Sequence, residues 1–439
     1  MAEQRADRTE HQPDAGPAGT APARRPLGPS SRSQVPDFEV MTILGRVSEL
    51  RAAGHDVVSL CAGEPGGGAP AAVNRRAAEI HASGRALNYT PSLGIAELRQ
   101  AISGHYRRWY GLDVDPARVA VTTGSSGAFM AGFLAAFNAG DRVAMARPGY
   151  AAYRNILTAL GCQVVEIDAG AEVRYQPTPE LLEQAEADHG PLAGLILASP
   201  NNPTGTMATR AEVKALAEWC HENSVRLVSD EIYHGITYAD GAAAGGDGDG
   251  DGDGDGDEPG DERGVCAWEY STEAMVISSF SKYWGMPGWR IGWMLMPEDL
   301  APAIGGLSGS VSLCPPAAAQ YAAVEAFADE SYAACDEQVA GFARARALLL
   351  DNQERLGWTD AAPADGAFYF YATPGERMLR KYGTSTAYCE ALLEQAHVAL
   401  TPGTDFDTAH GDQYIRLSFA AGHDAVREAI ERIVAFQRG

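Results

Sequence analysis

The sequence predicts an α/β fold, with a mostly parallel sheet and crossover helices followed by a smaller C-terminal α/β domain. Short runs rich in β-branched and apolar residues alternate with helical segments between residues 118 and 281, which is typical of strands joined by crossover helices. Near residue 300 the pattern changes to long helices, further β-rich runs and a final helix. A chain of 439 residues, of which 45% are hydrophobic, is long enough to bury the cores of two domains.

Each predicted element rests on a local run of residues. Six runs predict strands of the main sheet: 118–124, 141–146, 162–168, 194–200, 225–230 and 275–281. Residues 210–224 predict one of the intervening helices, which Thr209 is placed to cap. In the second domain we expect helices around 317–356 and β-rich runs at 368–372, 398–403 and 414–420.

Two segments lack the apolar pattern that a packed fold requires. Residues 1–34 are rich in Pro, Ala, Gly, Ser and charged residues, and they are predicted to form a disordered tail. Residues 241–262 hold an alternating Asp/Gly tract and are predicted to form a disordered surface loop. The rest is predicted to divide into an N-terminal segment that packs on the small domain (35–60), a large domain (61–300) and the small domain (301–439).

The Asp/Gly tract formally satisfies the calcium-loop pattern D-x-D-x-D-G-x5-E. The matching residues are Asp247, Asp249, Asp251, Gly252 and Glu258. Any Asp/Gly repeat of this length comes close to that pattern, and Gly254 stands where an EF-hand loop needs an apolar anchor. We therefore expect no specific metal site, and a calcium-binding structural protein is a weak alternative that rests on this repeat alone.

Charge and cysteine content bear on the partners and the compartment. The formal net charge is −24, and ten acidic residues lie in residues 240–262, so the rest of the chain carries −14. The lack of a visible basic face argues against nucleic acid as a partner. The seven cysteines are scattered without a C-x-x-C pair, which indicates reduced thiols and a cytoplasmic setting. We also expect no membrane span and no targeting segment, because no apolar run reaches about 18 residues.

Polar residues follow several of the predicted strands, at the edge where a parallel sheet binds ligands. The small-residue turn at 124–127 (GSSG) leads into a helix whose N-terminal amides can hold a phosphate. Asn202 follows another strand, and Asp230 and Tyr233 follow the next one. Taken singly, each has a structural explanation: a tight turn for GSSG and for Asn202, and a buried salt bridge for Asp230.

The stretch SFSKYWGMPGWRIGW places Lys282 among aromatic residues at the end of a predicted strand. An ammonium group removed from water tends to lose its proton, and a neutral lysine is a nucleophile. The alternative is that the side chain extends to solvent. The combination favours the first explanation, because pyridoxal phosphate needs an amine for a Schiff base, an anion site, a carboxylate for its ring nitrogen and donors for its phenolic oxygen.

Residues 279–292, SFSKYWGMPGWRIG, resemble the lysine signature of the class I/II aminotransferases, fold type I enzymes of the aspartate aminotransferase family that use pyridoxal 5'-phosphate. Further blocks resemble that family in the same order: AGEPGGGAP, YTPSLGIAELR, GSSGAF, RPGYAAY, SPNNPTG, SDEIY, TPGTDF and YIRLSFA. The resemblance covers about residues 35 to 437. It implies a homodimeric enzyme of amino acid metabolism that moves an amino group from an L-amino acid to a 2-oxo acid.

The resemblance also implies a role for each matching residue. Lys282 would form the Schiff base and transfer protons, Asp230 would keep the ring nitrogen protonated, and Tyr233 would donate to the phenolate oxygen. Further cofactor contacts are implied for Ser125, Ser126, Tyr150, Asn202, Ser279 and Arg290, and for Tyr89, which would reach the cofactor phosphate of the other subunit. Substrate contacts are implied for Gly63, Asn202 and Arg416, with Arg416 clamping the α-carboxylate.

Substrate and reaction type leave alternatives open. Helix 126–138 offers no cation near the site, and no second arginine is evident for a distal carboxylate, so we expect a broad or hydrophobic amino donor. A fold type I lyase or decarboxylase would show the same lysine, aspartate and phosphate site. A transcription regulator with an aminotransferase-like domain would need a DNA-binding domain before residue 35, where the 34-residue tail is too short.

Overall fold

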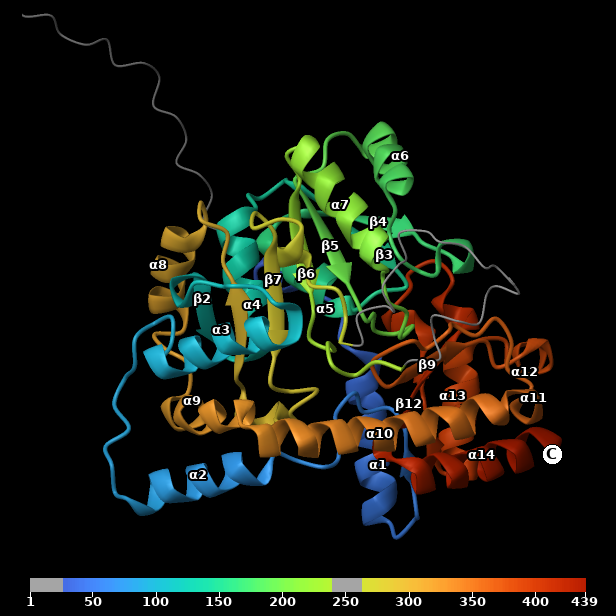
Figure 1. Ribbon diagram of the computed structural model, residues 1–439. Coiled ribbons are helices and arrows are strands. Elements are labelled where there is room, and N and C mark those ends of the chain that lie inside the picture. Colours follow the sequence, from blue (N-terminus) through green and yellow to red (C-terminus); the bar gives the residue numbers. More distant parts are fainter. Residues whose placement is uncertain (1–26, 239–262) are drawn as a thin grey trace, which may run out of the picture.

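A computed structural model describes residues 27–238 and 263–439. The predicted loop 241–262, its calcium-like pattern and most of the predicted tail lie outside these residues. In the described part, a large sheet with helices on both faces lies beside a smaller unit formed mainly by the C-terminal part of the chain (Figure 1). No helix in the described ranges is long and apolar enough to cross a membrane.

The main sheet has seven strands in the order β2-β8-β7-β6-β5-β3-β4. Their bounds are β2 (Val119–Thr122), β3 (Arg142–Arg147), β4 (Gln163–Asp168), β5 (Gly194–Ala198), β6 (Arg226–Asp230), β7 (Met275–Ser279) and β8 (Gly292–Leu295). Only β8 runs antiparallel to its neighbours, β2 and β7. The six predicted strands and the mostly parallel sheet are confirmed, whereas the sequence pattern does not predict β8.

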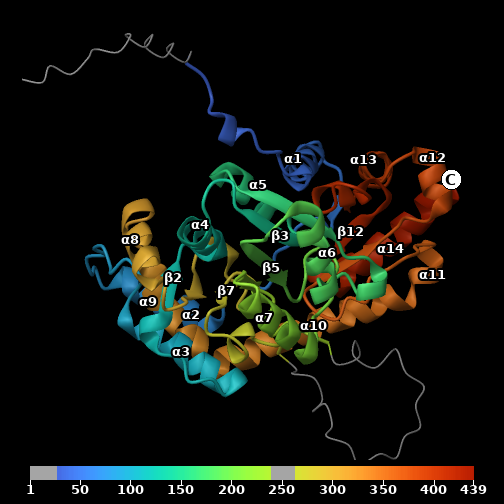
Figure 2. The same cartoon turned by 90° about the horizontal axis from the view of Figure 1, so that it is seen from above.

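Both faces of this sheet are buried, because successive strand residues point to opposite sides. Leu195 and Leu197 of β5 belong to one apolar cluster, whereas Ile196 between them belongs to another. Helices α4 and α5 lie on one side of the strands and α3 and α7 on the other (Figure 2). The bounds are α2 (Ala71–Ala82), α3 (Ala96–Tyr110), α4 (Gly124–Ala136), α5 (Ala151–Leu160), α6 (Pro179–His189) and α7 (Arg210–Glu222). The predicted cap is confirmed: Thr209 and Glu212 form a capping box at the start of α7.

The smaller unit contains two short sheets, β11-β12-β9 and β1-β10. The strands are β1 (Val58–Ser59), β9 (Tyr369–Ala372), β10 (Val398–Ala399), β11 (Thr401–Pro402) and β12 (Ile415–Ser418). The predicted run 398–403 is split between the sheets: β10 pairs in parallel with β1, and β11 pairs antiparallel with β12. The remaining helices are α1 (Glu39–Ala52), α8 (Ala301–Val311), α9 (Ala317–Ala323), α10 (Asp329–Asp351), α11 (Gln353–Leu356), α12 (Glu376–Tyr382), α13 (Ser385–Ala396) and α14 (His423–Arg438).

The N-terminal helix α1 packs on the smaller unit. Val47 and Leu50 of α1 share an apolar cluster with Leu393 of α13 and Ala399 of β10. By contrast, α8 and α9 follow the boundary expected at residue 300 yet pack against α4 and α2. These two helices therefore cover the main-sheet side of the molecule.

Candidate active site

Four of the predicted site residues lie where neighbouring strands end. Asp230 is the last residue of β6, Ser279 is the last residue of β7, and the turn after β7 carries Lys282. Asn202 lies in the turn that follows β5. Because β5, β6 and β7 are adjacent in the sheet, these strand ends lie side by side. Arg416 reaches the same place from β12 of the smaller unit.

The Lys282 side chain points inward rather than to solvent. Its Nζ donates a hydrogen bond to the carbonyl oxygen of Gly63 at 2.6 Å and lies 5.5 Å from the ring centre of Tyr233. Burial, and after it the Arg416 guanidinium, lowers the pKa of Lys282 to about 8, while Asp230 acts in the opposite direction. A sizeable neutral fraction of this amine is therefore present near neutral pH, as nucleophilic and base chemistry require.

Asp230 places a buried carboxylate beside this amine. It is 3% exposed and accepts hydrogen bonds from the Tyr153 hydroxyl and, at 3.2 Å, from the backbone N–H of Ile232. Burial raises the pKa of Asp230 to about 6, and the Tyr153 hydrogen bond opposes that rise. Within the described ranges Asp230 forms no ion pair, so the salt-bridge explanation is not supported. Its remaining lone pairs can accept an N–H from a ligand.

An anion-binding cradle forms where α4 begins. Gly124 starts the helix with φ +67°, and a Cβ atom there would lie 2.4 Å from Nη2 of Arg290. Glycine therefore lets the guanidinium approach the first turn of the helix, which Ser125 and Ser126 occupy. Ser279 and the last residue of β2 lie level with each other on either side of β8, and β2 leads directly into α4. The guanidinium, the helix amides and the hydroxyls together suit a phosphate.

Arg416 is a buried cation without a carboxylate partner in the part of the chain that the structure describes. Its Nη1 donates to Asn202 Oδ1 at 2.9 Å and its Nη2 to the Cys61 carbonyl at 2.7 Å, while Nε has no partner there. The guanidinium lies between the rings of Tyr369 and Phe406, 4.6 and 4.7 Å from their centres. An arginine that is held in this way and lacks a counter-charge is suited to the carboxylate of a ligand.

Tyr369 is a site residue that the sequence analysis misses. Its hydroxyl lies 2.7 Å from that of Tyr233, and its ring packs on Arg416. A Cβ atom at Gly63 would lie 2.3 Å from the Tyr369 hydroxyl, so only glycine fits at that position. In the sequence, Tyr369 is one of several aromatic residues in the run FYFYA, and nothing there distinguishes it from a core residue.

Two of the predicted tyrosine contacts, those of Tyr150 and Tyr89, differ in position. Tyr150 precedes α5, where its ring stacks with Phe38 at 6.2 Å and meets the edge of Tyr153 at 5.4 Å. Burial raises the pKa of Tyr150, and the neighbouring Tyr369 adds to that rise. Tyr89 lies on the loop between α2 and α3 and is 81% exposed. In a single chain Tyr89 is a surface residue, so its predicted role requires a second chain.

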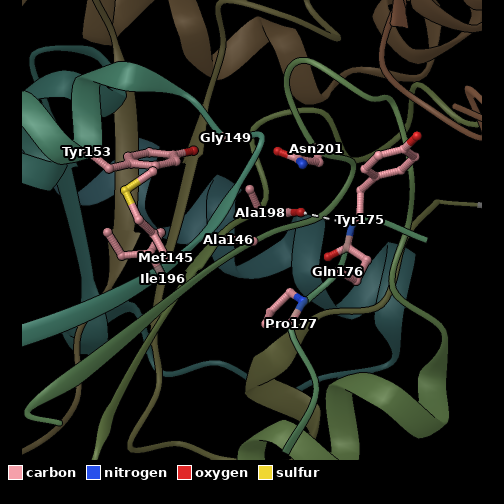
Figure 3. Close-up of a pocket in the computed structure, with 10 residues that line it drawn as sticks. All are labelled: Met145, Ala146, Gly149, Tyr153, Tyr175, Gln176, Pro177, Ile196, Ala198 and Asn201. Carbon is pink, nitrogen blue, oxygen red and sulfur yellow. Dashed lines mark hydrogen bonds between the residues drawn. The ribbon is translucent and has the colours of Figure 1, made fainter. Parts of the chain in front are cut away.

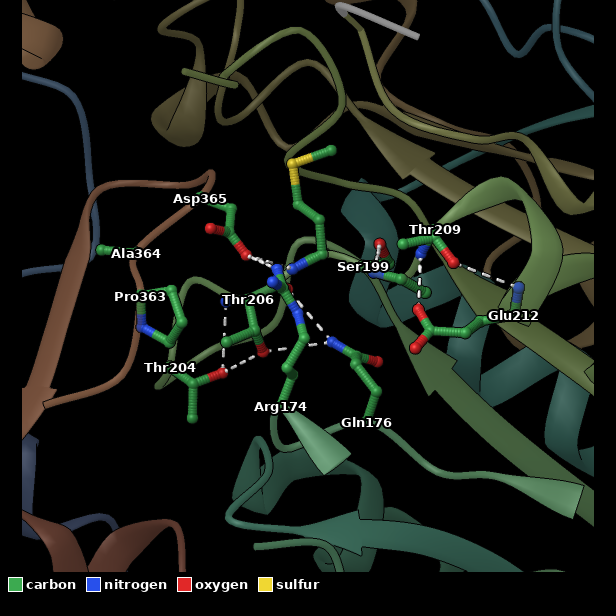
Figure 4. A network of polar contacts seen from close by, with 12 residues as sticks. Arg174, Gln176, Ser199, Thr204, Thr206, Thr209, Glu212, Pro363, Ala364 and Asp365 are labelled. Atoms are coloured by element: carbon green, nitrogen blue, oxygen red, sulfur yellow. Dashed lines mark hydrogen bonds and ion pairs between the residues drawn. The ribbon is translucent and has the colours of Figure 1, made fainter. Parts of the chain in front are cut away.

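A polar network holds the turn that carries Asn202 (Figure 4). Gln176 Nε2 donates to the Thr206 carbonyl at 3.1 Å and to the Thr206 hydroxyl at 3.2 Å. Two residues before Gln176, Arg174 pairs with Asp365, which belongs to the segment leading into β9. Side chains of both units therefore fix the turn, and with it the position of Asn202.

The small cavity beside Tyr153 is not large enough for a substrate (Figure 3). Its volume is about 10 Å³, and its lining includes Tyr153, Gln176 and Asn201. A single water molecule requires about this volume. Neither Lys282 nor Arg416, the charged groups that could act on an amino acid, lines this cavity.

These groups together fit pyridoxal 5'-phosphate. The cofactor needs an amine, a carboxylate for its ring nitrogen, a phosphate site and donors to its phenolic oxygen, and Lys282, Asp230, the α4 cradle and Tyr233 with Asn202 match that set. Within the described ranges the buried Asp230 carboxylate forms no ion pair and the Nε of buried Arg416 has no hydrogen-bond partner, and core packing explains neither arrangement. When bound, the cofactor supplies an electron sink for bonds at the substrate α-carbon. Fold and site therefore define a fold type I enzyme that depends on pyridoxal phosphate.

Comparisons with known proteins identify the family. The profile described as aminotransferase class I and II matches residues 55–433. The valine–pyruvate aminotransferase of Mycobacterium tuberculosis is 45% identical over 92% of this chain and 96% of that protein. The aspartate aminotransferase of Geobacillus stearothermophilus is 32% identical over 90% of this chain and 95% of that protein. A crystal structure of an aminotransferase from Mycobacterium tuberculosis has a TM-score of 0.85 at 43% identity and covers 94% of this chain and 100% of that one. The chain belongs to the class I and II aminotransferases.

The predicted fold class, cofactor and reaction class are confirmed by these comparisons. The protein is an aminotransferase (EC 2.6.1.-) that depends on pyridoxal 5'-phosphate and moves an amino group from an L-amino acid to a 2-oxo acid. The named relatives do not support the lyase or decarboxylase alternative. The roles of individual residues and the identity of the substrates stay predictions.

Proposed function

We propose that Lys282 carries the proton transfers of the reaction. A group whose pKa is about 8 can both accept and donate a proton near neutral pH. Asp230 would accept the N–H of the cofactor ring nitrogen, and Tyr233 would donate to the phenolic oxygen. Ser125, Ser126, Ser279 and Arg290 would hold the phosphate, and Tyr150 would pack on the ring.

Arg416 and Asn202 would bind the α-carboxylate of the substrate beside Gly63. The hydrogen bond from Arg416 Nη1 fixes the orientation of the Asn202 amide, because Oδ1 must face the guanidinium. The Nδ2 group of Asn202 then points away from Arg416, where it can donate to the cofactor. One asparagine would thus connect the substrate-binding and cofactor-binding groups.

The amino donor is proposed to have an apolar side chain, as in valine, with pyruvate as the acceptor. The observation that carries this proposal is the set of charges that most affect the Lys282 pKa, namely Arg416, Asp230, Glu64 and Arg290. With Arg416 assigned to the α-carboxylate and Arg290 to the phosphate, the described residues of a single chain leave no cation in this set for a distal carboxylate. Glu64 would repel one. The name of the Mycobacterium relative, valine–pyruvate aminotransferase, supports the same choice.

Steady-state kinetics with L-valine, L-alanine, L-leucine and L-aspartate, each paired with pyruvate and with 2-oxoglutarate, test this proposal. An uncompensated carboxylate in a buried site loses about 3 kcal/mol or more, which corresponds to at least about 100-fold in kcat/KM. L-valine with pyruvate should therefore exceed L-aspartate by about that factor. Glu64→Gln should reduce the ratio of kcat/KM for L-valine to that for L-aspartate, whereas Glu97→Gln on the exposed face of α3 should not. A preference for L-aspartate would refute the proposal.

A homodimer with shared active sites is also proposed. Four large apolar side chains are exposed on two segments, the loop between α2 and α3 and the end of α8 with the turn that follows it: Leu87, Tyr89, Val311 and Leu313. Gln320 joins these segments, because its Nε2 donates to Thr90 Oγ1 and to the Pro315 carbonyl, both at 2.9 Å. Apolar residues gathered on adjoining segments are typical of an interaction surface. A second copy of the chain would cover them and bring Tyr89 to the phosphate of its partner.

Complementation between inactive variants tests the shared site. Mixing Tyr89→Ala with Lys282→Ala should restore part of the activity, because one site of each heterodimer carries neither lesion. The control is each variant alone after the same treatment. Demonstrated subunit exchange without any return of activity would show that the sites are not shared.

The cytoplasmic compartment is proposed from the state of the cysteines. The seven cysteines are all unpaired, which supports a reducing compartment such as the cytoplasm. Fractionation of cells that produce the protein tests this.

The division into 35–60, 61–300 and 301–439 is also a proposal. Hydrogen exchange tests it, because the exchange should show whether α8 and α9 open with the small domain or with the main sheet.

A further inference from the structure

Tyr153 connects two residues of the proposed site, although no role has been assigned to it so far. It lies on α5, which follows β3, and its side chain reaches past β5 to the end of β6. There its hydroxyl donates to Oδ2 of Asp230. The ring is fixed on two sides, by the edge contact with Tyr150 at 5.4 Å and by Phe129 at 5.1 Å. The residue is 3% exposed, so water does not replace its hydroxyl.

Tyr153 is the side-chain donor to Asp230 within the described ranges. The other hydrogen bond to this carboxylate comes from the backbone of Ile232. The remaining titratable groups that interact with Asp230 or lie next to it are Lys282, Tyr150, Tyr369 and Glu231. Glu231 is turned away, since its Oε1 accepts the Ala267 N–H at 2.8 Å. The ionised form of Asp230 therefore depends on Tyr153 for its direct side-chain stabilisation.

We propose that Tyr153 is a positioning residue that keeps the Asp230 carboxylate ionised and oriented, so that the proton between Asp230 and the cofactor ring nitrogen stays on the nitrogen. This inference rests on the proposed role of Asp230. A hydrogen bond to the charged form of an acid makes that form a weaker base. Removing the hydroxyl makes the carboxylate a stronger base, and the proton moves from the ring nitrogen to an Asp230 oxygen, with no other bond made or broken. A ring nitrogen without its proton is a weaker electron sink.

Tyr153 itself stays a donor in this arrangement. Burial, and next the Asp230 charge, raises the pKa of Tyr153 well above its usual value. The hydroxyl therefore keeps its proton at any pH at which the enzyme works. The direction of the hydrogen bond is settled on these grounds, because an ionised carboxylate can only accept.

The test uses ring-¹⁵N-labelled pyridoxal phosphate bound to the dimeric enzyme, with the ¹⁵N chemical shift as readout. In Tyr153→Phe the signal should move from the protonated-pyridine position toward the unprotonated one. The rate constant kcat should fall by about ten- to a hundredfold, the usual effect of losing a hydrogen bond to a charged group, with the KM for the amino donor nearly unchanged. Tyr388→Phe is the matched control, because Tyr388 is also buried and its hydroxyl accepts from Gln437 at 3.0 Å in the smaller unit.

Two further variants separate the possible outcomes. Asp230→Asn should move the ¹⁵N signal if the proposed role of Asp230 is right, and no movement there would overturn the proposed function itself. Movement in Asp230→Asn without movement in Tyr153→Phe would overturn the inference on Tyr153 alone. Tyr153→Leu also lacks the donor but packs differently, so it should give the same shift as Tyr153→Phe. A shift that differs between these two variants would show a packing effect and contradict the proposal.

Discussion

Replacing Arg416 by lysine is expected to weaken binding of the amino donor far more than binding of the cofactor. Arg416 is 4% exposed, and its two terminal nitrogens already donate to Asn202 and to the Cys61 carbonyl. Its planar guanidinium can hold these acceptors and still present an edge to a carboxylate. A lysine keeps the charge but offers a compact ammonium on a flexible chain, so the paired geometry is lost.

The expected size follows from the contacts that are lost. One hydrogen bond to a charged group contributes about 1.5 to 3 kcal/mol, which corresponds to a rise in the KM of the donor of about ten- to 150-fold. In the proposed site the cofactor would be held mainly by the α4 cradle, Asp230 and Lys282. Its dissociation constant should therefore change by less than about threefold, or under 1 kcal/mol.

Steady-state kinetics with L-valine and a fluorescence titration of the cofactor-free protein measure the two quantities. Arg346→Lys is the matched control, because Arg346 is also buried and its Nε donates to the Ala364 carbonyl at 2.8 Å, away from the substrate groups. It should leave the KM of the donor nearly unchanged. Equal weakening of donor and cofactor in Arg416→Lys would refute the reasoning and point to a structural role.

Three other predictions concern the cofactor site and the Asp/Gly tract. The rate at which cofactor-free protein combines with pyridoxal phosphate should rise with pH and level off above a midpoint near 8, because only the neutral form of Lys282 is a nucleophile; a stopped-flow midpoint near the usual lysine pKa would contradict this. Asp230→Asn should retain bound cofactor but lower kcat by about 100-fold or more, and wild-type turnover would remove Asp230 from the mechanism. Deleting residues 245–259 should leave kcat and Tm nearly unchanged, because hydrogen bonds hold the chain on either side of the tract in place. The Tyr238 hydroxyl donates to the Ala367 carbonyl at 2.6 Å, and the Gly235 N–H donates to the Arg263 carbonyl at 2.8 Å. A large loss of activity would show that the tract contributes to function.

The main sheet was predictable because its strands carry their own signal. Runs such as 194–200 are largely apolar segments, as expected for strands buried on both faces, and the runs that form β2, β3, β4 and β5 are each followed by an α-helix before the next strand. The strand β8 lacks that signal, since it is only four residues long and its first residue, Gly292, is also the last residue of the lysine motif. The split of 398–403 was also unpredictable, because pairing with β1 or with β12 depends on tertiary contacts that lie far apart in the sequence.

The candidate site was predictable where chemistry and strand ends coincide. Asp230 and Lys282 end adjacent strands or follow them directly, so their type and place both point to a site. Tyr153 and Tyr369 carry no such signal. Tyr153 lies within a helix whose orientation is fixed by packing, and Tyr369 lies in a strand in which Tyr and Phe alternate. Their importance comes from hydrogen bonds to Asp230 and Tyr233, which only the folded structure brings within reach.

The most direct test of the account is the absorbance spectrum of the Lys282→Ala variant after reconstitution with pyridoxal phosphate. The chain has only three lysines, so Lys214→Ala and Lys381→Ala complete the set of controls. The wild type and both controls should show a visible band that changes on addition of L-valine, together with formation of the 2-oxo acid. Lys282→Ala should lose both the band and the turnover, because Nζ of Lys282 is the amine held beside Gly63 and Tyr233. If that variant kept the band and turned over L-valine, Lys282 would not be the reacting amine and the account would be wrong.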